Sequence, residues 1–239
     1  MKPLITICAR KGSKRLPGKH LRLLHGKPLI WWTLDQAFRW GKGHVLLSTD
    51  DNEIAEYARG VFPDVTMVWQ RRNYEPDATP KIDVIRNAAE DYGRLLGEIP
   101  KVIMDLDCCN PIREMRDLDI AFDLYKKHEP PSVVSVTEAR RNPWFNQLHR
   151  TTWNKLASPC GGMVVRSQDA PEVFDINCCI YVYRRDFLLD KANVKPYCSE
   201  SVVYIMAPWT FCDIDDSLDF DLVEFLMGKY LFGVRNEQI

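Results

Sequence analysis

Long hydrophobic runs are missing from this chain of 239 residues. No stretch approaches the roughly 18 consecutive apolar residues that a membrane-spanning helix needs. The first apolar run, residues 4–9, is also shorter than the roughly 7–15 residues of a signal-peptide core. It predicts a first buried strand, and we expect a cytoplasmic protein with no membrane partner.

An excess of either charge is also missing. The chain has 32 basic and 33 acidic residues, with a formal net charge of -1. A general nucleic-acid binder normally carries a basic excess, so we expect no nucleic-acid partner. A small anionic ligand remains possible because a local cluster can be strongly charged.

Spacings typical of soft-metal, redox and covalent catalytic sites are absent. The eight cysteines include two adjacent pairs, Cys108-Cys109 and Cys178-Cys179, but no CxxC spacing. The five histidines show neither HxH nor HExxH spacing. No Ser-His-Asp or Cys-His nucleophile pattern can be recognised, so covalent catalysis has no support. We expect small buried thiols in a reducing cytoplasm.

The chain does contain a regular alternation of strand-like and helical patterns. Strands are predicted over residues 3–9, 44–49, 65–69, 101–106 and 132–136, with helices beginning near residues 28, 51, 81 and 116. This alternation predicts right-handed βαβ units, and therefore one α/β domain over residues 1–239 with a mainly parallel sheet. Ligands of such sheets bind beyond the carboxyl ends of the strands.

Residues 137–175 interrupt this rhythm. The segment is rich in Arg, Asn, Pro and Gly and has a short strand-like piece at residues 162–165. It is interpreted as an insertion that serves as a dimerisation arm or a lid. Residues 177–183 and 202–206 then resume the sheet, and a final helix follows residues 213–221.

The loop after the first predicted strand is strongly basic. Residues 10–19 (RKGSKRLPGK) hold five cations, and Gly12 and Gly18 let the backbone approach a ligand closely. Backbone N–H groups and Ser13 can line a phosphate whose charge Arg and Lys side chains neutralise. The spacing fits neither GxxxxGK[ST] nor GxGxxG. The loop predicts a phosphate site of another kind, and the alternative is a solvated basic loop.

Acidic residues gather near the carboxyl end and after two strands. If residues 211–215 are extended, Asp213 and Asp215 share one side, which suits Mg²⁺. The alternative is helix capping, for which Asp216 is a candidate. Asp107 ends a predicted strand and could bind a metal or a nucleobase, or only begin a turn. The Asp50-Asp51 pair is interpreted as a helix N-cap.

These motifs together resemble those of one family, the acylneuraminate cytidylyltransferases. The segments that carry the resemblance are ICARKGSKRLPGKH with GKPLI, LLSTDDNEIAEYA, DLDCCNPIR, DINCCIYVYRRD and CDIDDSLDFDLVE. They look like the family's AR-x-GSK-x-x-PGKN, VSTD-x-x-x-IA, LLQPTSPLR, PNGAIY and DIDTELDF-x-x-AE segments. Each is weak alone, but five in the family's order are specific and span nearly the whole chain.

The resemblance implies a Rossmann-like three-layer α/β/α nucleotide-diphospho-sugar transferase fold. It also implies that CTP and a nine-carbon 2-keto acid sugar give a CMP-sugar and pyrophosphate, with Mg²⁺ as the cofactor, in a homodimer. Catalytic roles are implied for Arg10, Lys19, Asp213 and Asp215, of which the two aspartates would hold the metal. The nucleotide would contact Ala9, Arg10, Gly12, Ser13, Lys19 and Asp107. The sugar would contact Asn177, and Arg140, Arg166 and Gln168 are further candidates for this role.

Departures from the family pattern fall mostly on the sugar side. Asp107 stands where a Gln is usual, Asp175 where an Arg is usual, and Cys178 where a Gly is usual. They favour a bacterial nonulosonate such as legionaminate or pseudaminate over N-acetylneuraminate. The alternatives are a nucleotidyltransferase that uses another nucleoside triphosphate and a sugar 1-phosphate, a metal-dependent glycosyltransferase, and a non-catalytic nucleotide-binding module.

Overall fold

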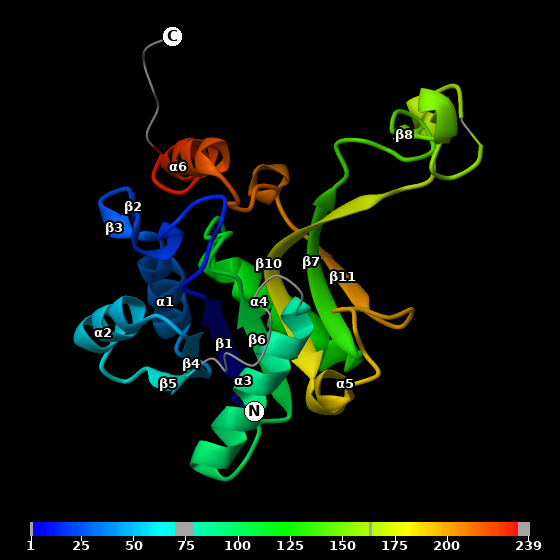
Figure 1. The fold of residues 1–239 in the computed structure, drawn as a ribbon. Coiled ribbons are helices and arrows are strands. Elements are labelled where there is room, and N and C mark those ends of the chain that lie inside the picture. Colours follow the sequence, from blue (N-terminus) through cyan, green and yellow to red (C-terminus); the bar gives the residue numbers. More distant parts are fainter. Residues whose placement is uncertain (1, 70–78, 163, 234–239) are drawn as a thin grey trace.

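A seven-stranded sheet forms the centre of the computed structural model, which describes residues 2–69, 79–162 and 164–233 (Figure 1). The strand order is β11-β7-β10-β6-β1-β4-β5. The strands are β1 (Leu4–Ala9), β4 (His44–Thr49), β5 (Thr66–Trp69), β6 (Val102–Leu106), β7 (Ser132–Glu138), β10 (Phe174–Arg184) and β11 (Val202–Ile205). A small hairpin, β2 (Leu23–Leu24) with β3 (Lys27–Pro28), precedes the first helix.

All strands of the sheet are parallel except one. Strand β1 pairs in parallel with β4 and β6, and so do β4 with β5 and β7 with β11. Strand β10 pairs antiparallel with both β6 and β7. The predicted mainly parallel sheet is therefore confirmed. The sequence pattern gave no sign that β10 reverses direction.

Helices cover both faces of the sheet, which confirms the three-layer arrangement. They are α1 (Leu29–Trp40), α2 (Asn52–Val61), α3 (Lys81–Leu96), α4 (Met115–His128), α5 (Arg185–Leu189) and α6 (Ser217–Tyr230). Side chains of β1 alternate between the faces. Ile5 and Ile7 join a core with α1, α2 and α4, whereas Leu4 joins a core with α3 and α5.

A third core ties the last helix to the loop that follows the first strand. Leu16 of that loop packs with Ile214, Phe220 and Val223 in a buried cluster. Residues from the two ends of the sequence are thus held together by apolar burial, beside the polar groups described below. Within the described residues, no helix is long and apolar enough to cross a membrane.

The segment between β7 and β10, residues 139–173, leaves the sheet and extends away from it (Figure 1). Its described residues form the two-residue strands β8 (His149–Arg150) and β9 (Leu156–Ala157), which pair antiparallel. They also form two single-turn 3-10 helices, η2 (Thr152–Asn154) and η3 (Ser167–Asp169). We call this segment the excursion. The strand expected over residues 162–165 is wrong for the described residues there, because the Val164 N–H donates to the carbonyl of Trp144 in a loop.

Candidate active site

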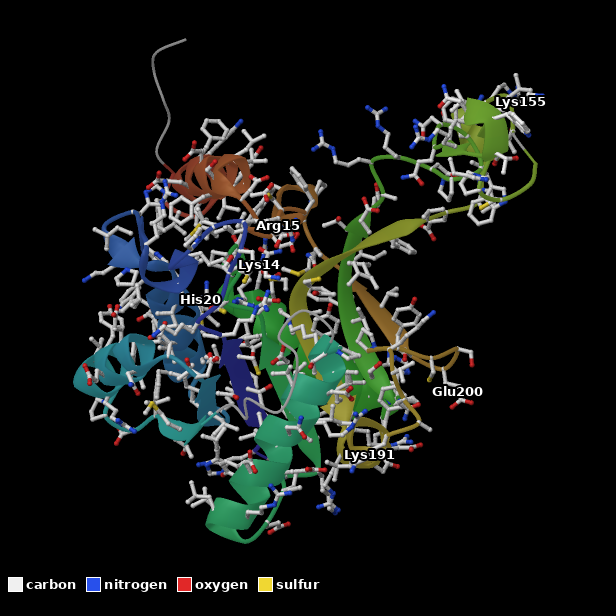
Figure 2. The ribbon with its side chains drawn as sticks, viewed as in Figure 1. Lys14, Arg15, His20, Lys155, Lys191 and Glu200 are labelled. Carbon is white, nitrogen blue, oxygen red and sulfur yellow. The ribbon has the colours of Figure 1, made fainter. Side chains whose placement is uncertain are left out.

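The basic loop lies at the carboxyl end of β1 and is tied to the next strand of the sheet. The backbone N–H of Lys11 donates to Asp50 at 2.6 Å, just beyond β4. Ser13 accepts from the N–H of Leu16 at 3.3 Å, and Gly18 at φ 68° starts the short 3-10 helix η1 (Lys19–Leu21). Figure 2 shows Lys14 and Arg15 on this loop. Two hydrogen bonds therefore hold the loop, and the turn at Gly18 ends it.

Asp51, in turn, caps the helix that follows β4. Its side chain accepts from the N–H of Glu53 at 2.9 Å at the start of α2. The predicted N-cap at this place is confirmed. Asp50 does not cap the helix; it accepts the hydrogen bond from the Lys11 N–H and so holds the basic loop.

The acidic segment near the carboxyl end meets this basic loop directly. Lys19 Nζ donates to the carbonyl of Ile214 at 2.8 Å, and Arg15 forms an ion pair with Asp215 at 2.7 Å. The Ile214 N–H donates to the carbonyl of Cys109 at 2.8 Å. Asp213 and Asp215 flank Ile214, so both carboxylates lie beside the basic loop and the segment that follows β6.

The later aspartates of the same segment cap the last helix, as the sequence predicted. Asp216 accepts from the N–H groups of Leu218 and Asp219, at 2.8 and 3.1 Å. Asp219 reciprocates by accepting from the backbone of Asp215 and Asp216. This capping box fixes where α6 begins, and therefore fixes the backbone that carries Asp213 and Asp215.

Carboxylates crowd one another at this place. Burial raises the pKa of Asp213, and the negative charges of Asp215 and Asp107 raise it further. A divalent cation would relieve this repulsion, and carboxylate oxygens are the donors that Mg²⁺ prefers. The residues present therefore fit a magnesium ion held by Asp213 and Asp215.

Asp107 is ionised and held by a lysine that sequence reasoning missed. Lys81, the first residue of α3, donates to Asp107 at 2.5 Å and lies 3.1 Å from Asp105. Burial alone would raise the pKa of Asp107, but the charge and hydrogen bond of Lys81 outweigh burial and lower it to about 2. The Lys81 ammonium also sits 5.1 Å from the ring centre of Tyr181. A negative side chain therefore faces the site where the family usually places an amide, with a cation beside it.

Lys19 keeps its charge in a half-buried place. Burial lowers the pKa of Lys19, but the neighbouring Cys109, Cys108 and Asp107 outweigh burial and raise it. His20, next along the chain, is only 5% exposed. Burial and the charge of Lys19 lower the pKa of His20 to about 4, so its imidazole is neutral at pH 7. Of these two neighbours, Lys19 is therefore the one that brings a positive charge to the acidic segment, where Arg15 brings another.

Arg113 organises the backbone behind the site and was not anticipated. Its guanidinium is 1% exposed and donates to Gln36, Thr33 and the carbonyls of Asp107 and Cys179, at 2.5 to 2.8 Å. These bonds join α1, the end of β6 and β10. The arginine at the end of the DLDCCNPIR segment was visible in the sequence, but nothing there indicated that it is buried.

Asn177 is buried and its amide is engaged by the protein. Its side-chain oxygen accepts from Ser135 at 2.6 Å, and its nitrogen donates to Thr210 at 3.0 Å. Its role as a sugar ligand stays a prediction that would require these bonds to rearrange. The next residue, Cys178, has a φ of 58°, a conformation that glycine adopts freely. The bend at Cys178 falls where β10 shifts register against β7.

The three other predicted sugar ligands lie in different places. The Arg140 guanidinium lies 4.7 Å from the ring centre of Phe211, which is close in sequence to Asp213. The backbone N–H of Arg140 donates to the Asp175 carboxylate at 3.3 Å. Arg166 and Gln168 lie on the excursion, where Arg166 pairs with Asp169 at 2.8 Å. The structure therefore brings Arg140 to the acidic segment and leaves Arg166 and Gln168 away from it.

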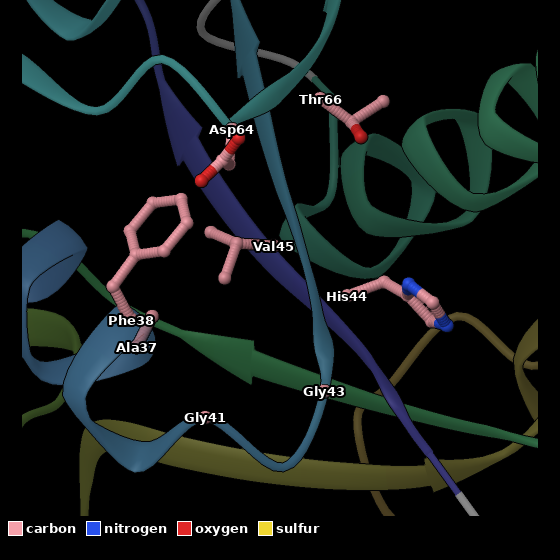
Figure 3. A pocket seen from close by; sticks show the side chains of 8 residues that line it. All are labelled: Ala37, Phe38, Gly41, Gly43, His44, Val45, Asp64 and Thr66. Atoms are coloured by element: carbon pink, nitrogen blue, oxygen red, sulfur yellow. The ribbon is translucent and has the colours of Figure 1, made fainter.

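A separate pocket lies at the opposite end of the sheet. It is lined by residues around the start of β4, including Phe38, His44, Asp64 and Thr66 (Figure 3). Strand β4 runs from His44 to Thr49, so this pocket opens near its amino end, whereas the basic loop lies beyond its carboxyl end. It therefore does not belong to the candidate active site.

Comparison with known proteins shows the family to which the chain belongs. Residues 4–204 match the family described as cytidylyltransferase. The chain is 32% identical over 234 residues to the post-translational flagellin modification protein B of Campylobacter coli, covering 95% of each chain. It is 32% identical over 233 residues to the CMP-N,N'-diacetyllegionaminic acid synthase of Campylobacter jejuni, covering 94% of each chain.

Solved structures show the same fold. CMP:2-keto-3-deoxy-manno-octonic acid synthetase complexed with CTP aligns with a TM-score of 0.70, at 19% identity, over 96% of this chain and 99% of that chain. A 4-diphosphocytidyl-2C-methyl-D-erythritol synthase from Anaerococcus prevotii aligns with a TM-score of 0.64, at 10% identity, over 95% of this chain and 98% of that chain. The α/β architecture with its mostly parallel sheet is thus shared with nucleotidyltransferases.

Proposed function

This chain belongs to the cytidylyltransferase family, and we propose that it couples CTP to a nonulosonic 2-keto acid sugar, releasing pyrophosphate. The family membership makes it an enzyme of cytidylyl transfer. The sugar class rests on the name of a relative that shares 32% of its residues and on the sequence motifs quoted above.

One observation carries the proposal: the basic loop meets the acidic segment. Lys19 donates to the carbonyl between Asp213 and Asp215, and Arg15 pairs with Asp215. Cations suited to phosphates and carboxylates suited to a metal are therefore joined by direct contacts, although about 200 residues separate them. A bound metal-triphosphate needs both kinds of group.

In the proposed reaction these residues position the triphosphate and neutralise its charge. The anomeric hydroxyl of the sugar attacks the α-phosphorus of CTP, an oxygen–phosphorus bond forms, and the bond to pyrophosphate breaks. Arg10 and Lys19, with Gly12, Ser13 and the backbone after Ala9, hold the triphosphate and neutralise the charge that builds on the leaving group.

We propose Mg²⁺ as the cofactor, held by Asp213 and Asp215. The support is the place of Asp213, where burial first, and then the negative charges of Asp215 and Asp107, raise its pKa. When bound, the ion would polarise the α-phosphate and favour ionisation of the attacking hydroxyl. Arg15 pairs with Asp215 in this structure, so it is placed to exchange that carboxylate for a phosphate.

The experiment that tests the function is a substrate panel read by mass spectrometry. The purified chain is incubated with Mg²⁺, one of four nucleoside triphosphates, and one candidate sugar. The sugars are legionaminate, pseudaminate, N-acetylneuraminate, 3-deoxy-manno-octulosonate and a sugar 1-phosphate. We expect a CMP-sugar and pyrophosphate with a nonulosonate and CTP alone. A product formed only from another triphosphate, or only from a sugar 1-phosphate, would refute the proposal.

We propose that the working form is a homodimer joined through the excursion. Large apolar side chains are exposed there, with Trp153 91%, Val165 90%, Leu156 68% and Leu148 52% exposed. Apolar groups gathered at a projecting segment are typical of a protein–protein contact. A partner would bury them, and it could bring the excursion's Arg166 and Gln168 towards a site.

All eight cysteines are free thiols. Free thiols are the usual state in a reducing compartment, and on this basis we propose that the chain works in the cytoplasm.

A further inference from the structure

One cluster of side chains beside the active site has no part in the proposed transfer reaction. It consists of His20, Cys108 and Cys109, whose ligand atoms all lie within 4.8 Å of one another. The Cys108 sulfur lies 3.5 Å from His20 Nδ1 and 3.4 Å from the carbonyl oxygen of Cys8. His20 and Cys108 are buried and Cys109 is half-buried, so the cluster is closed on the inside and reachable through Cys109.

The distances fit the edges of a small tetrahedron. With a zinc–sulfur distance of about 2.3 Å and a zinc–nitrogen distance of about 2.0 Å, a sulfur and a nitrogen on one ion lie about 3.5 Å apart, and two sulfurs about 3.8 Å. The observed 3.5 Å between Cys108 and His20 meets the first value. The remaining separations are within 4.8 Å, so a bound ion would require the Cys109 sulfur to move by at most about 1 Å to reach these values.

The charges fit as well. Two thiolates and one neutral imidazole cancel the charge of a divalent cation, so the loaded site costs little to keep buried. Burial keeps His20 neutral at pH 7, which leaves a lone pair for a metal. A coordinated thiol loses its proton even where burial disfavours the free anion.

We propose that His20 Nδ1, Cys108 Sγ and Cys109 Sγ form a binding site for a thiophilic divalent cation of the zinc class. The fourth position is open to water or to a backbone carbonyl. This site is distinct from the carboxylate pair at Asp213 and Asp215, because sulfur and imidazole ligands select softer ions than Mg²⁺. The proposal does not depend on which sugar the enzyme uses.

A metal ion bound at this site could affect the transfer reaction, because Cys109 contacts the active-site backbone. The carbonyl of Cys109 accepts from the N–H of Ile214, and the N–H of Cys109 donates to Asp107. Lys19 lies beside the Cys109 thiol and donates to the Ile214 carbonyl. An ion that draws Cys109 towards His20 therefore disturbs the backbone carrying both aspartates. We expect zinc to inhibit the transfer and a chelator to restore it.

The binding test uses Co²⁺ on the reduced, tag-free full chain, without substrates. Tetrahedral thiolate–cobalt complexes have visible and near-ultraviolet bands that carboxylate-bound cobalt lacks. We expect one such ion per chain, displacement by an equal amount of Zn²⁺, and release of two protons per bound ion in a weakly buffered titration. Cys109→Ser should weaken binding at least about 100-fold, the upper range for disturbing a metal's surroundings.

The matched control is Cys160→Ser, because Cys160 is exposed on the excursion. Its cobalt spectrum and affinity should equal those of the unmodified chain. Cys109 is half-buried, so its serine variant should fold, and a thermal melt checks this; Cys108→Ser provides a second variant. The proposal is overturned if no thiolate–cobalt band appears. It is also overturned if the band survives in folded Cys109→Ser or disappears in Cys160→Ser.

Discussion

The active-site end of the sheet and the excursion are built in opposite ways. At the active site, contacts join segments far apart in sequence: Lys19 to Ile214, Lys11 to Asp50, and Arg113 to Cys179. In the excursion, contacts join residues of that one segment, such as Arg166 with Asp169 and the Thr151 N–H with the Lys155 carbonyl. The first region carries buried polar groups, and the second exposes apolar ones.

This difference indicates what stabilises each region and what each region does. The active site is held by the whole fold, so its charged groups are preorganised for a ligand. The excursion has little buried core of its own, with Trp153 and Val165 about nine-tenths exposed. These exposed apolar side chains are the ones that the proposed dimer would cover. Four substitutions, each with a matched control, test this difference between the two regions. They are given from the largest expected effect to the smallest.

Arg113→Met should cause the largest loss of stability. It removes the guanidinium's hydrogen bonds to two buried carbonyls and to the Gln36 amide oxygen, and hydrogen bonds from a charged group contribute about 1.5–3 kcal/mol each. We expect the free energy of unfolding, measured by urea denaturation, to fall by at least about 3 kcal/mol. Arg166→Met in the excursion removes an exposed ion pair, and it should cost less than about 1 kcal/mol. Equal losses of unfolding free energy in the two variants would contradict the difference between the active site and the excursion.

Asp215→Ala should lower kcat at saturating Mg²⁺ by at least about a hundredfold, the scale of losing one key electrostatic contact. Steady-state pyrophosphate release measures it. Asp123→Ala is the matched control, because Asp123 is an exposed aspartate that pairs with Lys126 at 2.6 Å on α4. It should leave kcat unchanged. Near-normal turnover of Asp215→Ala would remove the proposed metal role.

Trp153→Ala tests the excursion as an interface. An exposed tryptophan that becomes buried between subunits contributes at least about 2 kcal/mol, so self-association should weaken about 30-fold. Sedimentation equilibrium measures the dissociation constant. Exposed Leu218 on α6 offers a control, since Leu218→Ala should leave association unchanged. A monomeric unmodified chain, or a Trp153→Ala dimer of full strength, would contradict the proposal.

Lys19→Ala should weaken CTP more than the sugar. Loss of one charge-assisted hydrogen bond to a phosphate predicts about a tenfold rise in the KM for CTP, measured at saturating sugar. Lys127→Ala, an exposed lysine on α4, should change neither KM. An equal rise in both KM values after Lys19→Ala would argue against a triphosphate at the basic loop.

Local patterns predicted the elements of the sheet well. The bounds of β4 (His44–Thr49) and the start of α3 at Lys81 were predicted from the pattern of apolar residues, and the structure confirms them. Such predictions succeed because the period of the apolar residues reports the local element directly. That the basic loop and the acidic segment share one site was implied by the family resemblance, and the structure joins them by direct contacts.

Features that depend on distant partners escaped the sequence. A lysine at the start of a helix is usually solvated, so Lys81 gave no sign that it would bridge Asp105 and Asp107. The reversal of β10 depends on its neighbours β6 and β7, not on its own pattern. The sequence also gave no sign that the side-chain amide of Asn177, whose role as a sugar ligand stays a prediction, bonds to Ser135 and Thr210.

The most direct test of the account is a crystal structure of the chain with Mg²⁺ and a non-hydrolysable CTP analogue. The account predicts phosphates against the loop that holds Arg10 and Lys19, with the ion bound by Asp213 and Asp215. A nucleotide seated elsewhere, for example in the pocket of Figure 3 beside His44 and Asp64, would contradict it. So would an ion bound without either aspartate.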